Sequence, residues 1–240
     1  MKLVAHRGGG CPENTIESII DILGLNIYDG IEIDVQITKD NVLVLFHDDD
    51  TERITGQRFI IKEMTYNELL KLDAGYTWPK YRNKGYKIPR LKDVLALTKK
   101  RNIILHLDLK DENCVMPAIK LLLVYKNQFK EIYLDSSKHS VNEKIIQSLA
   151  VENIKGVYTC ASTLETIKTY ALYLLNVEYK TRDVVYLYLN WVTLPLLTLS
   201  LITFFKNQDI CVGVYGPKVS ESNKDYFGSM GIDLCICDHC

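Results

Sequence analysis

The strongest constraint on the fold is a regular alternation of short, β-rich apolar runs with segments of helical periodicity. The runs interpreted as strands are Leu3–His6, Gly30–Val35, Ile103–Leu109, Glu131–Asp135, Gly156–Cys160, Val184–Asn190, Ile210–Tyr215 and Leu234–Cys237. The helical patterns between them are Thr15–Leu25, Leu91–Lys99, Val115–Phe129, Asn142–Leu149, Leu164–Tyr173, Leu196–Phe205 and Lys224–Met230. Eight such strands in a chain of 240 residues predict an α/β fold of the TIM-barrel, (β/α)8, type.

One further apolar run, Val42–Phe46, breaks this alternation. It follows Val35 after only six residues, Gln36 to Asn41, whereas a parallel crossover needs about a dozen or more. We therefore expect it to pair antiparallel with the second strand as a hairpin. His47 then lies near the start of strand two, on a peripheral excursion, or is carried back by the next loop, and the sequence leaves these three placements open.

The chain is expected to form a single domain over residues 1–240, with an insertion at about 48–90. That segment lacks barrel periodicity, although Thr65-Tyr66-Asn67-Glu68 has the pattern of a helix capping box. Because Cys240 directly follows the last strand, the last outer helix is expected to be absent. An open doubly wound sheet is the alternative, but Cys11-Pro12-Glu13 interrupts the glycine-rich loop that such a sheet would use.

Composition restricts the partners. The formal net charge of -1 gives no general electrostatic reason to expect nucleic acid or an anionic membrane as a partner. The longest apolar stretch, Trp191–Phe205, is too short to span a bilayer, and the N-terminus lacks the apolar region of a signal peptide. The odd number of cysteines, seven, favours reduced thiols and a cytoplasmic location.

Alternating acidic residues on two strands indicate a metal site. Glu32 and Asp34 share one strand face, which points inward in a barrel, and neighbouring carboxylates there repel unless a cation compensates. Mg²⁺ or Ca²⁺ is the simplest compensation, and salt bridges to Arg7 or Lys110 are the alternative reading. Asp108 ends the third barrel strand and can supply a third metal oxygen.

Four basic side chains complete a set suited to phosphate esters. Lys110 shares the strand face of Asp108, and Arg7 ends the first strand, so both can contact a phosphate. His6 and His47 can form an acid and base pair. His106 is expected one layer below the site as a hydrogen-bonded core histidine.

The loop after the first strand has helix-starting chemistry. Asn14 is expected to cap the first helix, with Glu17 completing a capping box. Pro12, Glu13 and Asn14 are then expected to shape the loop that carries His6 and Arg7, and not to take part in chemistry.

At this point the sequence resembles the glycerophosphodiester phosphodiesterase family, within the PLC-like phosphodiesterase superfamily of TIM barrels. The matching motifs are His6-Arg7-Gly8, Pro12-Glu13-Asn14-Thr15, Glu32-Ile33-Asp34-Val35, Thr38-Lys39-Asp40, His47-Asp48, Arg53-x-Thr55-Gly56, Ile88-Pro89-x-Leu91, Gly231-Ile232-Asp233 and Cys237-Asp238. In this order and spacing the set is highly specific, and it covers the chain from its first residues to its last.

The resemblance implies a barrel with an insertion after the His-Asp motif, one Mg²⁺ or Ca²⁺ ion, and hydrolysis of glycerophosphodiesters to sn-glycerol 3-phosphate and an alcohol. Glycerophosphocholine and glycerophosphoethanolamine are examples of such substrates. The implied acid and base are His6 and His47, and the implied phosphate contacts are Arg7 and Lys110. The implied metal ligands are Glu32, Asp34 and Asp108.

Three features depart from the family pattern, and one of them is Arg90, where the family usually has Thr after Ile-Pro. The third carboxylate is usually Glu, and here it is Asp108, as in related barrels of the sphingomyelinase D type. The family's Trp-Thr-Val-Asn run appears as Tyr215-Gly216-Pro217-Lys218, in which Tyr215 keeps an aromatic wall for substrate binding.

Two alternatives stay open beside the hydrolase. The same catalytic set can serve a lyase of the phospholipase D type on lysophospholipid or sphingomyelin. A phosphate-ligand binding protein that has lost catalysis through Asp108 or the Tyr215 loop is the non-enzymatic alternative.

Overall fold

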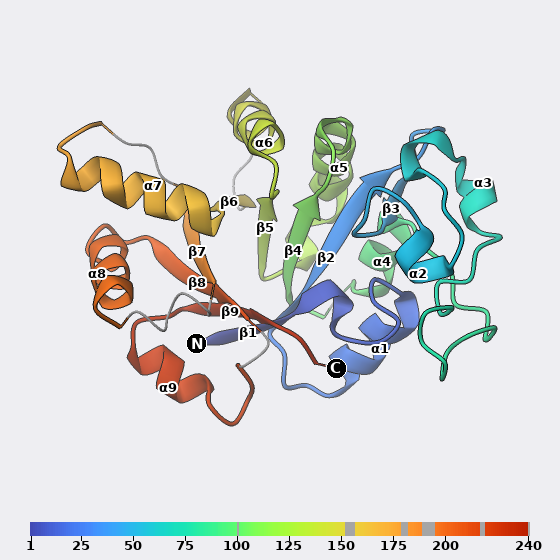
Figure 1. The fold of residues 1–240 in the computed structure, drawn as a ribbon, viewed down its shortest axis with the longest axis horizontal. Coiled ribbons are helices and arrows are strands. Elements are labelled where there is room, and N and C mark those ends of the chain that lie inside the picture. Colours follow the sequence, from blue (N-terminus) through green and yellow to red (C-terminus); the bar gives the residue numbers. More distant parts are fainter. Residues whose placement is uncertain (100, 152–156, 179–181, 189–194, 217–218, 240) are drawn as a thin grey trace.

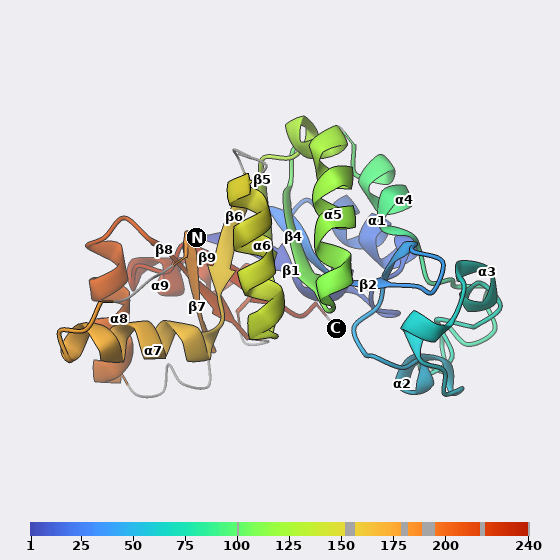
Figure 2. The same ribbon diagram turned by 90° about the horizontal axis from the view of Figure 1, so that it is seen from above.

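A closed parallel barrel forms the body of the molecule (Figures 1 and 2). The computed structural model describes residues 1–99, 101–151, 157–178, 182–188, 195–216 and 219–239. Within these ranges eight parallel strands close the barrel: β1 (Lys2–Ala5), β2 (Gly30–Ile37), β4 (Ile104–Leu109), β5 (Glu131–Asp135), β6 (Val157–Ala161), β7 (Val184–Tyr188), β8 (Cys211–Tyr215) and β9 (Leu234–Cys237). The sheet runs β1-β9-β8-β7-β6-β5-β4-β2, and pairing of β1 with β2 closes it, which confirms the predicted fold class.

Helices cover the outside of the barrel between successive strands. They are α1 (Ile16–Gly24), α4 (Leu91–Leu97), α5 (Glu112–Tyr125), α6 (His139–Val151), α7 (Thr163–Leu174), α8 (Pro195–Lys206) and α9 (Lys224–Ser229). Each strand and helix matches a sequence-predicted segment to within a few residues. Gly156, Leu189 and Asn190 of the predicted strands, and residues 191–194 of the long apolar stretch, lie outside the described residues.

The predicted hairpin is confirmed by β3 (Leu43–Leu45), which pairs antiparallel with the far end of β2. Only Gly30 to Val35 of β2 pair with β4, so the last residues of β2 project beyond the barrel wall. The returning arm brings Phe46 back to Asp34, where the Phe46 amide donates to the Asp34 carbonyl over 3.1 Å. His47 is therefore carried back to the barrel, the third of the placements left open by the sequence.

After β3 the chain builds a lobe beside the barrel, which holds α2 (Glu52–Thr55) and α3 (Tyr66–Leu69) (Figure 1). The lobe has its own small core, which includes Ile54, Ile61 and Leu69, all nearly inaccessible to solvent. Helix α3 starts with the predicted capping box between Thr65 and Glu68. The absence of barrel periodicity in this segment thus reflects a core separate from that of the barrel.

Two apolar layers and one polar layer organise the barrel. Apolar side chains on the outer strand faces pack against the helices, as Ile31 and Leu105 do. A second set of apolar side chains, which includes Val4 and Ile104, fills the lower interior. The polar residues gather above them, at the end where the strands terminate, called the mouth below. This is the end at which enzymes of this architecture build their active sites.

The turn after β1 depends on glycine. Arg7 and Gly8 both have positive φ, 51° and 75°, in the short 3-10 turn His6–Gly9. A Cβ atom at Gly8 would lie 2.8 Å from the Ile19 side chain on α1. Glycine therefore lets the turn pack tightly on α1, which fixes where His6 and Arg7 leave the strand.

No helix within the described ranges is long and apolar enough to cross a membrane.

Candidate active site

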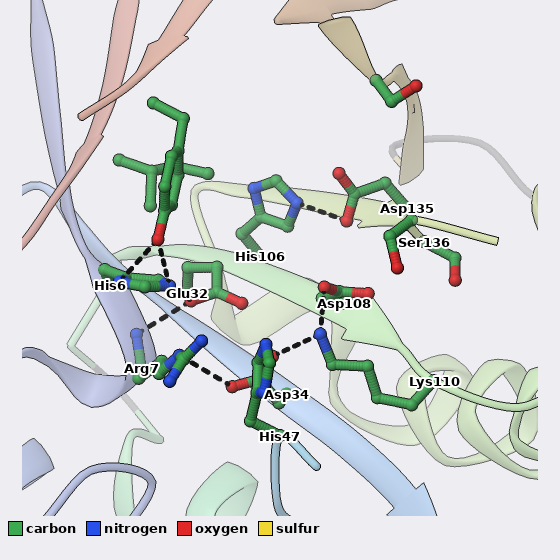
Figure 3. A pocket seen from close by; sticks show the side chains of 14 residues that line it. His6, Arg7, Glu32, Asp34, His47, His106, Asp108, Lys110, Asp135 and Ser136 are labelled. Carbon is green, nitrogen blue, oxygen red and sulfur yellow. Dashed lines mark hydrogen bonds and ion pairs between the residues drawn. The ribbon is translucent and has the colours of Figure 1, made fainter. Parts of the chain in front are cut away.

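A cavity of about 310 Å³ opens at the mouth of the barrel (Figure 3). All eight sequence-predicted site residues line it: His6, Arg7, Glu32, Asp34, His47, Asp108, Lys110 and Tyr215. Five further residues line it: His106, Asp135, Ser136, Ser137 and Ser162. Of these, only His106 had been given a place by the sequence, as a core histidine one layer below the site.

Strand register brings the acidic residues together. Asp34 on β2 is directly beside Asp108 on β4, and Asp108 is beside Asp135 on β5. Glu32 is beside His106 in the row below. Because residues two apart on a strand share a face, all of these side chains point into the barrel.

Glu32, Asp34 and Asp108 form a compact carboxylate cluster. One oxygen from each lies within 4.8 Å of the other two. Glu32 and Asp34 are only 4% and 1% exposed. One oxygen of Asp108, Oδ1, is buried and has no hydrogen-bond partner among the described residues. Three carboxylates lie close together, and one of them has a buried oxygen without a hydrogen-bond partner. This arrangement fits a hard divalent cation.

Lys110 partly neutralises the cluster. Its Nζ lies 2.7 Å from Asp34 Oδ1 and also donates to Asp108 Oδ2. Burial raises the pKa of Asp34, but Lys110 and His47 outweigh that effect and hold the pKa below its usual value. The salt-bridge reading of the acidic pair is therefore correct for Asp34 and does not exclude a metal ion there.

One lysine does not compensate the other two carboxylates. Burial, followed by repulsion from Asp34 and Asp108, raises the pKa of Glu32 well above its usual value. Burial raises the pKa of Asp108 to about 7, in spite of Lys110. The cluster thus carries more negative charge than its neighbours balance, which favours a bound cation.

His6 is held at the end of β1 by two partners. Its Nδ1 lies 2.6 Å from Asp238 Oδ1, and the Tyr215 hydroxyl lies 2.7 Å from its Nε2. Burial lowers the pKa of His6, although the hydrogen bond with Asp238 opposes this effect. Burial thus favours the neutral form of the imidazole, and Nε2, the nitrogen nearer to the Tyr215 hydroxyl, can exchange a proton.

His47 reaches the cavity from the opposite arm of the hairpin, beside Asp34 (Figure 3). Its Nδ1 lies 2.6 Å from Asp48 Oδ1. His6 and His47 are thus each paired with an aspartate at Nδ1, an arrangement that orients the ring and leaves Nε2 for chemistry.

Arg7 joins the cavity to the loop that follows. Its amide donates to Glu32 over 2.8 Å, and its Nη1 donates to Glu13 over 3.0 Å. Its Nε lies 3.7 Å from Asp34 Oδ2. The guanidinium therefore lies at the edge of the carboxylate cluster, where it can meet an anionic ligand.

The predicted cap of the first helix is wrong. Thr15, and not Asn14, caps α1, and its side chain accepts a hydrogen bond from the Ser18 amide. Asn14 adopts positive φ and turns to Asp34 instead, with its Nδ2 donating to Asp34 Oδ2 over 2.7 Å. A residue with N-cap chemistry thus orients a carboxylate of the cluster.

Other parts of the site follow the sequence more closely. His106 is 1% exposed and hydrogen-bonded, with Nε2 2.9 Å from Asp135 Oδ1, as expected for a core histidine. Tyr215 ends β8 and forms part of the cavity wall. Pro217 and Lys218, which follow it in the altered family motif, lie outside the described residues.

Comparison with known proteins identifies one family. The model of the glycerophosphoryl diester phosphodiesterase family matches residues 6–239. A glycerophosphodiester phosphodiesterase of Caldanaerobacter subterraneus is 33% identical over 66% of this chain and 67% of its own length. For the Bacillus altitudinis enzyme of the same name, the values are 37% identity over 50% of this chain and 49% of the relative.

Solved structures share the fold. A phosphodiesterase of Oleispira antarctica, in complex with the product sn-glycerol-3-phosphate, superposes with a TM-score of 0.77 at 21% identity, covering 100% of this chain and 93% of the other. A glycerophosphodiester phosphodiesterase of Agrobacterium tumefaciens gives a TM-score of 0.76 at 20% identity, covering 99% and 96%. At these identities the likeness establishes the architecture alone.

Proposed function

Because this chain belongs to the glycerophosphoryl diester phosphodiesterase family, and with it to that class of enzyme, we propose that it hydrolyses glycerophosphodiesters to sn-glycerol 3-phosphate and an alcohol. Glycerophosphocholine and glycerophosphoethanolamine are the proposed substrates. The observation that carries the proposal is one cavity in which His6 and His47, the basic side chains of Arg7 and Lys110, and a carboxylate cluster come together. The product bound to the Oleispira antarctica phosphodiesterase supports the choice of ester.

The proposed cofactor is one divalent ion, Mg²⁺ or Ca²⁺, held by Glu32, Asp34 and Asp108. The buried, unsatisfied Asp108 oxygen and the excess of carboxylates favour it. When bound, such an ion supplies positive charge that stabilises the phosphate oxygens as negative charge develops on them.

The side chains of this protein then have defined tasks. Arg7 and Lys110 bind and orient the diester through their positive charges. His6 and His47 are the acid and base: one accepts the proton of the attacking hydroxyl or water, and the other donates a proton to the leaving alkoxide. Asp238 and Asp48 hold the rings of His6 and His47 in the orientation that presents Nε2 to the substrate. Tyr215 forms an aromatic wall for the substrate.

The proposed location is the cytoplasm, on the basis of the odd number of cysteines. Fractionation of cells that express the tagged full chain tests it, and recovery in a secreted or membrane fraction would contradict it.

Phosphorus NMR of the reaction tests the function. Purified protein with glycerophosphocholine and Mg²⁺ should accumulate sn-glycerol 3-phosphate, and a chelator should stop the reaction. His6→Gln and His47→Gln should each lower kcat by about 100-fold or more. His139→Gln, which alters an exposed histidine on α6, is the matched control and should have normal kcat.

The same spectra separate the alternatives. A lasting cyclic phosphate, or turnover confined to lysophospholipid or sphingomyelin, would indicate the lyase. Normal turnover in both histidine variants would refute the mechanism. Ligand binding without turnover of any diester would indicate a binding protein.

A further inference from the structure

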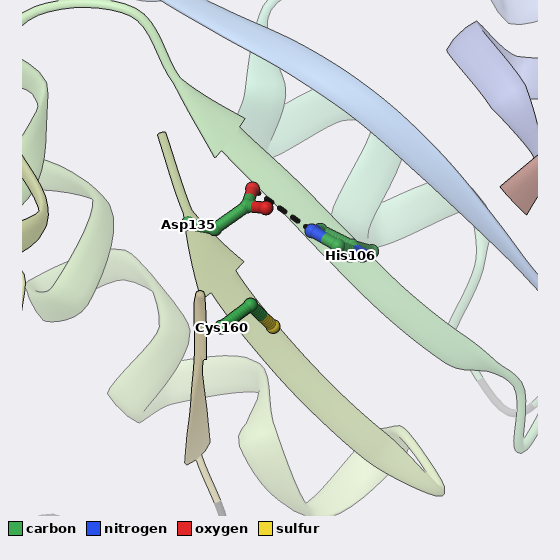
Figure 4. Close-up of side chains that lie close together, drawn as sticks. All are labelled: His106, Asp135 and Cys160. Carbon is green, nitrogen blue, oxygen red and sulfur yellow. Dashed lines mark hydrogen bonds and ion pairs between the residues drawn. The ribbon is translucent and has the colours of Figure 1, made fainter. Parts of the chain in front are cut away.

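A second group of side chains that could hold a metal ion lies on three adjacent strands of the barrel (Figure 4). It consists of His106 on β4, Asp135 on β5 and Cys160 on β6. One ligand atom from each lies within 4.8 Å of the other two. We propose that these three residues bind a second divalent cation of the thiophilic class, with Zn²⁺ as the best match.

Strand register builds this group, as it builds the first. Leu134 on β5 is in register with Thr159 on β6, so the next residues, Asp135 and Cys160, are neighbours on the inward face. His106 lies one row lower on β4 and reaches up to Asp135, with 2.9 Å between Nε2 and Oδ1. Three adjacent strands thus each contribute one ligand, on rigid elements rather than on loops.

The burial of the group matches a three-ligand site with one open side. His106 and Cys160 are each 1% exposed, so an ion between them would be shielded from bulk water on the wall side. Asp135 is less buried, and both Asp135 and His106 line the cavity. Zinc sites that keep a coordination position open for water or substrate commonly have three protein ligands.

The donor atoms select a different ion from that of the first cluster. Glu32, Asp34 and Asp108 offer only carboxylate oxygens, which suit Mg²⁺ or Ca²⁺. A thiolate, an imidazole and one carboxylate suit Zn²⁺ far better. The two clusters would therefore hold different metals from the same solution.

The two clusters meet at Asp108 and Asp135, which are register partners. Asp108 Oδ1 is buried without a hydrogen-bond partner among the described residues, on the residue next to the proposed second site. Two carboxylates side by side repel each other, so a cation at Asp135 relieves Asp108 as well.

A purely structural role for these three residues is the competing explanation. His106 and Asp135 form a hydrogen bond, and Cys160 also belongs to the apolar interior with Val4 and Ile104, where cysteine often serves as a small hydrophobic residue. Metal binding would replace the hydrogen bond by coordinate bonds from His106 and Asp135. The proton of His106 Nε2 would move to Nδ1 through solvent exchange, and the thiol proton of Cys160 would be released to solvent. A direct probe of sulfur–metal bonding distinguishes the two explanations.

Cobalt(II) alone is the probe, added to the chelator-treated full chain without substrate. Bonding to Cys160 should produce the near-ultraviolet absorption of a thiolate-to-cobalt charge transfer at one equivalent, and Zn²⁺ should abolish it. If the wild-type protein shows no such absorption at saturating Co²⁺, the proposal is wrong, and this result depends on no variant.

Variants locate the site. Cys160→Ser should remove the absorption, and Asp135→Asn should weaken Co²⁺ binding by about tenfold or more. Cys114→Ser is the matched control, because Cys114 is equally buried but lies outside the barrel wall, where its thiol donates to the Val35 carbonyl. Absorption that survives Cys160→Ser and disappears in Cys114→Ser would overturn the assignment.

The readout is independent of the proposed hydrolase activity. Glu32→Gln should abolish Mg²⁺ binding and leave the cobalt–thiolate absorption within about twofold of the wild-type intensity. Loss of that absorption in folded Glu32→Gln protein, as checked by circular dichroism, would show that the metal–thiolate bond belongs to another site and would contradict the proposal.

Discussion

Arg53 forms a bidentate salt bridge with Glu13, in which Nη2 lies 2.6 Å from Oε1 and Nη1 lies 3.1 Å from Oε2. The two residues are 40 positions apart: Glu13 follows β1 and Arg53 lies in the lobe. Arg53 also donates through Nε to Asp48, the partner of His47, over 2.5 Å. One arginine thus connects the environment of His47 to the loop that carries Arg7.

Arg53→Gln should lower kcat by about 10- to 100-fold, because Asp48 loses the cation that orients it and His47 shifts in the cavity. Arg53→Lys should have an intermediate kcat, since lysine keeps the positive charge but cannot form the bidentate contact of the guanidinium. Steady-state kinetics with glycerophosphocholine measure both. Arg58→Gln, a change of a largely exposed arginine in the same lobe, should have wild-type kcat. Equal effects at both positions would mean that the lobe is merely destabilised.

Asp238→Asn should lower kcat by about 10- to 100-fold with little change in KM, because the amide no longer favours the ring orientation that presents Nε2 of His6. Asp238→Glu should restore part of the loss. Asp225→Asn, at an exposed position on α9, serves as the control. A rise in KM without a fall in kcat would argue that Asp238 contacts the substrate instead.

Removal of the divalent ion should lower the melting temperature. At a concentration of Mg²⁺ or Ca²⁺ about 100 times the Kd, the ion should raise Tm by roughly 5–10 °C, measured by scanning fluorimetry. Asp108→Asn should abolish the shift, whereas Asp93→Asn on α4 should retain it. A full shift in Asp108→Asn would place the ion elsewhere.

The lower end of the barrel should respond to acid. Lys2 Nζ lies 2.5 Å from Glu131, and the Tyr133 hydroxyl donates to the same carboxylate. Burial raises the pKa of Glu131, but these two partners outweigh it and hold the pKa below its usual 4.5. The resulting stabilisation is present above the unfolded-state pKa and is lost as pH falls through the folded-state pKa.

Lys2→Met should therefore reduce the free energy of unfolding at pH 7 by up to about 1 kcal/mol. The deficit should shrink as the pH falls below 4.5, because a protonated Glu131 gains nothing from Lys2. Urea titrations at several pH values measure it. A deficit that is the same at pH 7 and pH 3 would show that Lys2 acts through packing.

Local patterns were sufficient to predict most of the fold. The alternation of strand and helix signals located the barrel strands, and the short gap between Val35 and Val42 was enough to predict an antiparallel partner for β2. The destination of the returning arm was not predictable, because it depends on how far β2 extends beyond its pairing with β4. The hydrogen bond from the Phe46 amide to the Asp34 carbonyl continues the hairpin pairing and shows where the arm returns.

The site residues were predictable where strand parity places them, as for Glu32, Asp34 and Asp108. Asp135 carried the same signal, since it ends a predicted strand at the mouth. Asn14 misled because an Asn before a helix satisfies the rule for an N-cap, and only its distance to Asp34 in three dimensions reveals its other use. Both Arg53 and Glu13 stand in motifs shared with the family, but their pairing was not predictable, because neither residue has a periodic or capping role that would show which residues meet in space.

The register of the β2–β3 hairpin determines the distance between His47, one of the proposed acid–base pair, and the carboxylate of Asp34. Strand pairing fixes His47 relative to Asp34 on the same ribbon, so the turn sets their spacing in steps of two residues. Each step would slide His47 by about 6.6–6.8 Å while its side chain stayed on the same face. A change in this surface turn during evolution could therefore move His47 relative to the carboxylates, and so alter or abolish acid–base catalysis, while the sequence of the barrel strands stays the same.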